Sequence, residues 1–189
     1  MDVKQNSGVQ SVLPQADVPL DRYRDMIQAA DGLSLGQVCS IATLEPSTVQ
    51  NWVKRGFVPH PIGKKYHERH LARILLIAAL RDGMQIDQIG ALLTFVNGDA
   101  DDESDDIVSE EQLYGALCRI VRAARARIPD FSEIPALVRS VTQDYNGPSP
   151  AAALRLREAL SVMACAAIAG MYKQEAERRF TALREKQED

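Results

Sequence analysis

A short amphipathic helix followed at once by helix-breaking residues constrains this chain more than any other feature. Val49, Trp52 and Val53 are spaced to share one face of a helix. The opposite face carries polar and basic side chains and no carboxylate: Ser47, Gln50, Asn51, Lys54 and Arg55. Amides can bond base edges and cations can pair with phosphates, so this face has the chemistry of a DNA-reading helix. The alternative is an ordinary amphipathic helix with a solvated polar face.

The flanking residues predict a second short helix before it and a turn-rich loop after it. Ser34 and Gln37 have capping-box spacing at the start of an apolar stripe that runs to Ala42. Pro46 suits the first turn of the next helix, and Gly56 suits its end. Two short helices joined by a tight turn form a helix-turn-helix. Residues 57–66 hold two prolines and a glycine, so we expect a two-stranded loop with a basic tip, which is a wing.

This run resembles the winged helix-turn-helix of MerR-type bacterial regulators over roughly residues 30 to 115. Thr48-Val49-Gln50-Asn51-Trp52 stands where that family has T-hydrophobic-R-Y-Y, and residues 65–74 stand where it has R-Y-S-x-x-D-L-x-R-L. The string Gln-Asn-Trp-Val-Lys-Arg-Gly is more similar still to an uncharacterised MerR-like bacterial family of unknown function. Two departures are Gln50 and Asn51 in place of the Arg-Tyr pair, and His67 in place of a capping serine.

The resemblance and the polar face together define a set of expected DNA contacts. Because the Arg-Tyr pair is replaced, Lys54, Arg55, Lys64 and Lys65 would carry the phosphate contacts. The complete set of candidate DNA-binding residues is Ser47, Thr48, Gln50, Asn51, Lys54, Arg55, Lys64, Lys65, Tyr66 and Arg69.

Charge is unevenly distributed along the chain. The whole protein of 189 residues carries a formal charge of −4, yet residues 34–82 contain seven basic and three acidic side chains. Contact with nucleic acid should therefore be confined to this basic module. The three cysteines are far apart in sequence and no apolar run would span a membrane, so we expect a reduced, cytoplasmic protein.

The expected fold class is mainly α, with a winged helix-turn-helix followed by a C-terminal helical region that includes one long helix. Residues 1–17 are expected to form a mobile tail, and residues 18–98 the MerR-like module with an N-terminal helix. Residues 99–108 form an acidic linker, and residues 109–189 a helical bundle and dimerisation region.

Two clusters of side chains, one acidic and one of histidines, could be read as metal sites, but neither is predicted to bind a metal. The acidic run 99–106 lacks the glycine and the terminal glutamate of an EF-hand loop, so a solvated linker is preferred to a calcium site. His67 and His70 lie three residues apart, near His60, but no further ligand pattern completes a zinc site. For these histidines, positions in the wing and at a helix cap are preferred to a metal site. No metal or cofactor is predicted.

Residues 150–186 form one unbroken helical pattern with an almost wholly apolar centre. Its stripe of Leu160, Ala164, Ala167 and Met171 fits either a dimer seam or the central helix of a monomeric bundle. The sequence leaves both alternatives open.

The leading hypothesis is a bacterial, sequence-specific transcriptional regulator that binds double-stranded DNA as a homodimer. The alternative is a MerR-like protein-interaction adaptor without direct DNA binding. No catalytic arrangement is present in the sequence, so we expect no enzyme. An effector, either a small molecule or a protein, is allowed for but not identified.

Overall fold

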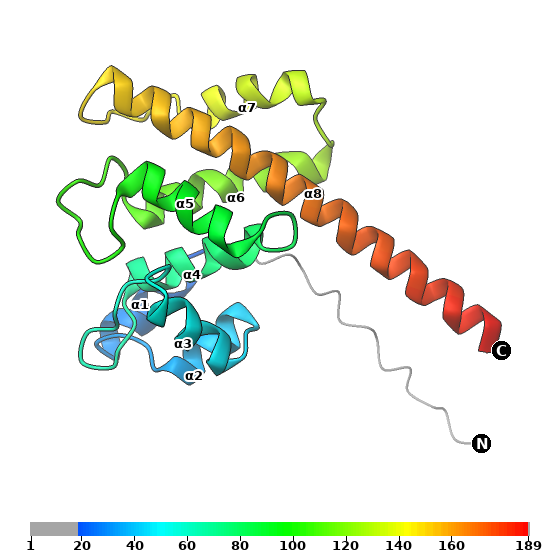
Figure 1. Cartoon of the computed structure of the whole chain (residues 1–189), viewed down its shortest axis with the longest axis horizontal. Coiled ribbons are helices and arrows are strands. Elements are labelled where there is room, and N and C mark those ends of the chain that lie inside the picture. The colour runs from blue at the N-terminus through cyan, green and yellow to red at the C-terminus, as the bar shows by residue number, and fades with distance from the viewer. Residues whose placement is uncertain (1–18, 189) are drawn as a thin grey trace.

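The computed structural model describes residues 19–188, and its architecture is mainly helical with one long C-terminal helix, as expected (Figure 1). The predicted tail 1–17 lies outside the described residues. The elements in chain order are α1 Asp21–Ala29, α2 Leu35–Ala42, α3 Pro46–Lys54, α4 Glu68–Leu80, α5 Ile86–Asn97, α6 Glu110–Ala126, the 3₁₀ turn η2 Phe131–Glu133, α7 Ile134–Val141 and α8 Pro150–Glu188.

Helix α4 is the central element of the core. Its sequence has apolar residues on almost every side, which predicts burial on more than one face, and nearly all of its residues are buried. It contacts α2, α5, α6 and α8. One apolar cluster extends from Leu20 near α1 to Ile168 in α8. The basic module and the C-terminal helices therefore share a single core.

Helices α2 and α3 form a compact pair against α4. The Ser34 Oγ accepts from the Gln37 N–H at 3.3 Å, and the Gln37 side chain accepts from the Ser34 N–H at 2.8 Å, which is the predicted capping box. Thr43 ends α2 in the left-handed region with φ of 50°. Pro46 occupies the first turn of α3.

The segment between α3 and α4 does not form the expected two-stranded wing. The described residues contain two isolated bridges here, Leu33 with Tyr66 and Ile62 with Lys65, and no full strand. The Ile62–Lys65 bridge has backbone hydrogen bonds of 3.0 and 2.8 Å, and it encloses Gly63 and Lys64, both with positive φ. This is the backbone pattern of a type I′ hairpin turn. Two prolines leave too few backbone donors for longer strands.

Helix α8 has a buried first half and a projecting second half (Figure 1). At about 1.5 Å per residue it is about 58 Å long. The stripe of Leu160, Ala164, Ala167 and Met171 packs within this chain's own core. These residues are therefore not available as a seam between two copies, and the central-helix alternative is correct for this face.

The turn between α4 and α5 approaches α8 with no side chain in between. A methyl group on Gly83 would lie 2.0 Å from the carbonyl oxygen of Ala166 and 3.1 Å from the backbone nitrogen of Gly170. Only glycine permits this approach without moving the backbone. From residues 19 to 188, no helix is long and apolar enough to cross a membrane.

Candidate nucleic-acid interface

Helix α3 presents a polar face to solvent because two apolar residues anchor its other side. Val49 is fully buried and Trp52 is only 6 % exposed, which confirms that the indole belongs to the core. The predicted contact residues Ser47, Gln50, Asn51 and Lys54 are exposed, and Thr48 is half-buried. The face that was predicted to read DNA is thus open to solvent along the whole helix.

Lys64 lies at the exposed tip of the hairpin. Its φ of 65° places it in the left-handed region, which only glycine and asparagine adopt readily. The tip therefore carries a cation at a position where turn geometry alone would favour another residue. Its side chain points away from the core that holds the base of the hairpin.

Tyr66 is buried, and the half-buried Lys65 has acceptors within the chain, so neither presents a free polar group to DNA. The Lys65 ammonium donates to the carbonyl oxygens of Ala30 at 3.2 Å and Gly32 at 3.4 Å. Tyr66 is 5 % exposed, and burial raises the pKa of its phenol. Both assignments as DNA-contact residues are corrected. The bridge between Leu33 and Tyr66 turns these two side chains toward α1 and the core.

Arg55 and Arg69 are exposed or half-exposed, but they have partners within the chain. The Arg55 guanidinium lies 4.5 Å from the centre of the Phe57 ring and forms an ion pair with Asp87 at the start of α5. Arg69 donates to the Ala100 carbonyl oxygen at 2.8 Å and pairs with Glu103. A phosphate would have to compete with these contacts.

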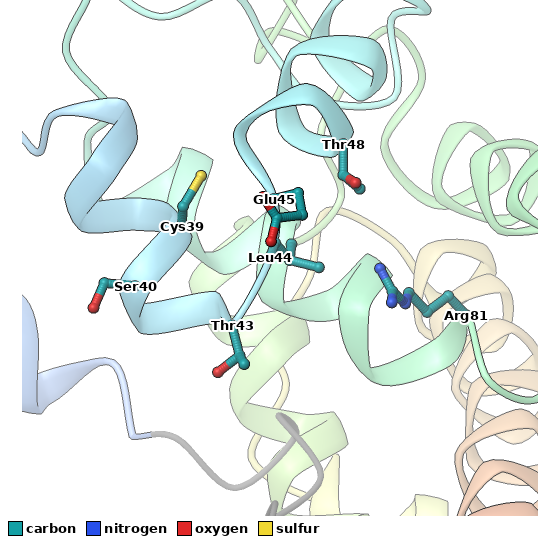
Figure 2. Close-up of a pocket in the computed structure, with 7 residues that line it drawn as sticks. All are labelled: Cys39, Ser40, Thr43, Leu44, Glu45, Thr48 and Arg81. Carbon is teal, nitrogen blue, oxygen red and sulfur yellow. The ribbon is translucent and has the colours of Figure 1, made fainter.

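A pocket of about 430 Å³ opens at the N-terminus of α3 (Figure 2). Thr48 from α3 and Arg81 from the end of α4 face each other across it. The remaining lining residues belong to α2 and the α2–α3 turn: Cys39, Ser40, Thr43, Leu44 and Glu45. Arg81 is an exposed cation near the N-terminus of α3, so it has the chemistry of a phosphate ligand, although the motif did not include it. The Glu45 carboxylate in the same pocket would oppose an anion.

Within residues 19–188, no hydrogen bond or ion pair engages the side chains of Lys54, Lys64 and Arg81. We call these three the unpaired cations. Lys54 lies on α3, Arg81 lies beside the N-terminus of that helix, and Lys64 lies on the hairpin that follows its C-terminus. All three therefore lie on α3 or on segments at its two ends.

His67 and His70 form the cap of α4, and His60 lies in the loop that precedes it. His70 is almost fully buried; its Nε2 lies 3.1 Å from the His60 carbonyl oxygen, and its Nδ1 accepts from the His67 N–H at 3.1 Å. Burial lowers the pKa of His70. A neutral imidazole with its proton on Nε2 satisfies both bonds, so His70 joins the start of α4 to the preceding loop.

A buried ion pair fixes this loop to the C-terminal half. Arg73 and Glu110 are 2 % and 3 % exposed and form an ion pair, and Arg73 Nε also donates to the Phe57 carbonyl oxygen at 2.8 Å. Sequence reasoning missed this pair. The available signal was one arginine within an otherwise apolar stretch of α4, since arginine is rarely buried without a partner.

Comparison with known protein families finds a match. Residues 10–117 match the family described as "Domain of unknown function (DUF1836)". The chain belongs to this family. The DUF1836 match includes α1 to α5 and the first part of α6, and hence the whole candidate interface and the Arg73–Glu110 pair.

One curated relative of this DUF1836 protein is "Uncharacterized protein YkrK" of Bacillus subtilis (strain 168). The two are 28 % identical over 131 residues, which cover 62 % of this chain and 56 % of YkrK. The matched part thus spans about half of the relative's length. No solved structure matches the chain.

Proposed function

We propose that the protein is a cytoplasmic, sequence-specific transcriptional regulator that binds double-stranded DNA. In this proposal residues 34–66 act as a winged helix-turn-helix similar to that of MerR-type regulators, and α3 enters the major groove. The observation that carries the proposal is the outward face of α3. It presents Gln50 and Asn51 free of carboxylates, with the unpaired cations Lys54, Lys64 and Arg81 on α3 or on segments at its two ends.

The two kinds of side chain have separate roles. An amide donates and accepts at once, so Gln50 or Asn51 can match adenine N6 and N7. The unpaired cations contact phosphates and position the helix without reading sequence. Because the chain has a net charge of −4, binding should depend strongly on the local basic surface and on salt.

The deciding experiment is selection of genomic fragments by the purified protein, followed by titration of the enriched duplex and a scrambled one at one salt concentration. The proposal expects a common sequence among the fragments and tighter binding to it than to the scrambled duplex. Absence of binding to any duplex at low salt would overturn it.

A second candidate is a protein-interaction adaptor that does not bind DNA. The favouring observation is that Arg55, Arg69 and Arg73 pair with carboxylates of this same chain, which leaves fewer free cations than the sequence suggests. This candidate predicts that the purified protein ignores DNA at low salt, so the same titration separates the two.

We further propose that the regulator is a homodimer, joined by the solvent-facing side of α8 instead of its buried stripe. That side carries exposed apolar residues spaced for one face, namely Leu154, Val162, Tyr172, Phe180 and Leu183. Phe180 and Leu183 are 62 % and 61 % exposed on the projecting half of the helix. An isolated helix segment is marginal in water, so a second copy covering this side would stabilise it.

Sedimentation equilibrium tests the dimer directly. The intact protein should have twice the monomer mass, and the double substitution F180E/L183E should give monomers that keep the helical circular-dichroism spectrum. A wild-type protein that sediments as a monomer at micromolar concentration would overturn this part without affecting DNA binding by one module.

A further inference from the structure

The acidic segment 99–106 is folded back onto the loop that precedes α4. Asp101 accepts the His60 backbone N–H at 2.8 Å with one carboxylate oxygen, and its other oxygen lies 2.8 Å from His60 Nδ1. Glu103 pairs with Arg69, which also donates to the Ala100 carbonyl oxygen. The segment was expected to be a solvated linker; instead it engages His60 and Arg69, and Arg69 is one of the predicted DNA contacts.

Hydrogen bonds hold the segment in a conformation that directs the Asp101 and Glu103 carboxylates toward His60 and Arg69. Its base is closed in the interior, where the Asn97 amide donates to the Val108 carbonyl oxygen at 2.7 Å. Within it, Asp99 accepts from the Asp101 N–H and Asp102 accepts from the Ser104 N–H, each at 2.9 Å. Ala100 is buried at its start. Asp101 and Glu103 therefore face the loop, while Asp102 bonds only within the segment.

The contacts are of the kind that a polyanion can replace. Arginine, protonated histidine and a backbone N–H are standard phosphate ligands, and a carboxylate offers them similar oxygen acceptors. The acidic side chains remain half or more exposed, at 50 % for Asp101 and 64 % for Glu103. Exposed ion pairs contribute little to stability, so displacing them does not require unfolding the core.

We propose that the segment 99–106 is an intramolecular competitor of DNA, which covers His60 and Arg69 in the free protein and is displaced when the sugar–phosphate backbone binds there. The inference rests on the proposed function and adds regulation to it. His60 and Arg69 become a backbone-contacting surface next to the hairpin tip, and any ligand that draws the acidic segment away would favour DNA binding.

The test compares two double substitutions that remove the same charge from the same segment. D101N/E103Q removes the carboxylates that face His60 and Arg69, and D102N/D105N removes two that pair with no basic side chain in the described chain. Affinity for a duplex is measured by fluorescence anisotropy at one fixed salt concentration. Circular dichroism and urea unfolding show that each variant is folded.

If the segment competes with DNA, D101N/E103Q should bind on the order of tenfold more tightly than the wild type. D102N/D105N should gain less than about twofold, the general effect of reduced net charge. Equal gains in both variants, or wild-type affinity in D101N/E103Q, would overturn the competition while leaving DNA binding intact. If neither the wild type nor any variant binds DNA at low salt, the proposed function itself fails.

Discussion

The basic side chains of residues 34–82 fall into two groups that look alike in sequence and differ in structure. The unpaired cations Lys54, Lys64 and Arg81 project into solvent. The paired group bonds to carboxylates or carbonyl oxygens far along the chain and consists of Arg55, Lys65, Arg69 and Arg73. A count of lysine and arginine therefore overstates the surface available to phosphate, and tertiary partners decide which cations remain.

The largest effect should come from breaking the buried member of the paired group. Glu110→Ala leaves the Arg73 guanidinium buried without its counter-ion, which should cost roughly 3–5 kcal/mol of unfolding free energy. Urea unfolding measures this loss. Glu103→Ala is the matched control at an exposed pair and should cost about 0–1 kcal/mol. Similar small losses of unfolding free energy in both variants would show that burial does not make the Arg73–Glu110 pair more important for stability than the exposed pair.

Base readout should produce the next largest effect, on the outward face of α3. Asn51→Ala removes an amide while keeping the helix and the unpaired cations, so it should lose roughly 1–3 kcal/mol on the preferred duplex and little on a scrambled one. Paired titration at one salt concentration measures both. Equal losses on the two duplexes would mean that the amide contacts only the backbone.

The salt dependence of DNA binding should distinguish the unpaired cations from the paired ones, with a smaller effect than base readout. Lys54→Ala or Arg81→Ala should reduce the slope of log affinity against log salt by about one, with sequence preference unchanged. Arg55→Ala, whose guanidinium already pairs with Asp87, should change the slope much less. Lys64→Asn tests the hairpin tip, because asparagine tolerates the positive φ while removing the charge. A larger slope change for Arg55→Ala than for Lys54→Ala would contradict the division into unpaired and paired cations.

The smallest effect concerns a carboxyl close to the buried pair. Burial and repulsion from Glu110 raise the pKa of Asp106 to about 6. Because this folded-state pKa lies above the usual value of about 3.9, ionisation of Asp106 lowers stability as the pH rises through about 6. Stability of the wild type should fall between about pH 4 and about pH 6, so Asp106→Asn should be more stable than the wild type at pH 8 and nearly equal to it at about pH 3.5. Urea unfolding at both pH values measures this.

Local spacing predicted the parts of the fold that depend on neighbouring residues. The Ser34 capping box, the burial of Trp52 and the wide apolar face of α4 all follow from periodicities of a few residues. The long helix after Pro150 follows in the same way.

Side-chain partners could not be predicted in this way because they join distant segments. Lys65 turns inward because the bridge between Leu33 and Tyr66 brings the carbonyl oxygens of residues 30 and 32 within reach. Arg69 is occupied because the acidic segment folds back across it. Neither contact produces a periodic pattern in the sequence. Both determine which residues of the candidate site remain free to contact a ligand.

The glycine contact at the end of α4 joins the long helix to the turn that follows α4. Gly83 touches the backbone of α8 near Ala166 and Gly170, close to where that helix leaves the body of the protein. With no side chain between them, α8 and this turn are in direct backbone contact, so a larger residue at position 83 would have to move the two segments apart. Arg81, which lines the pocket at the start of α3, lies two residues before Gly83, so one short turn holds both this cation and the contact with α8.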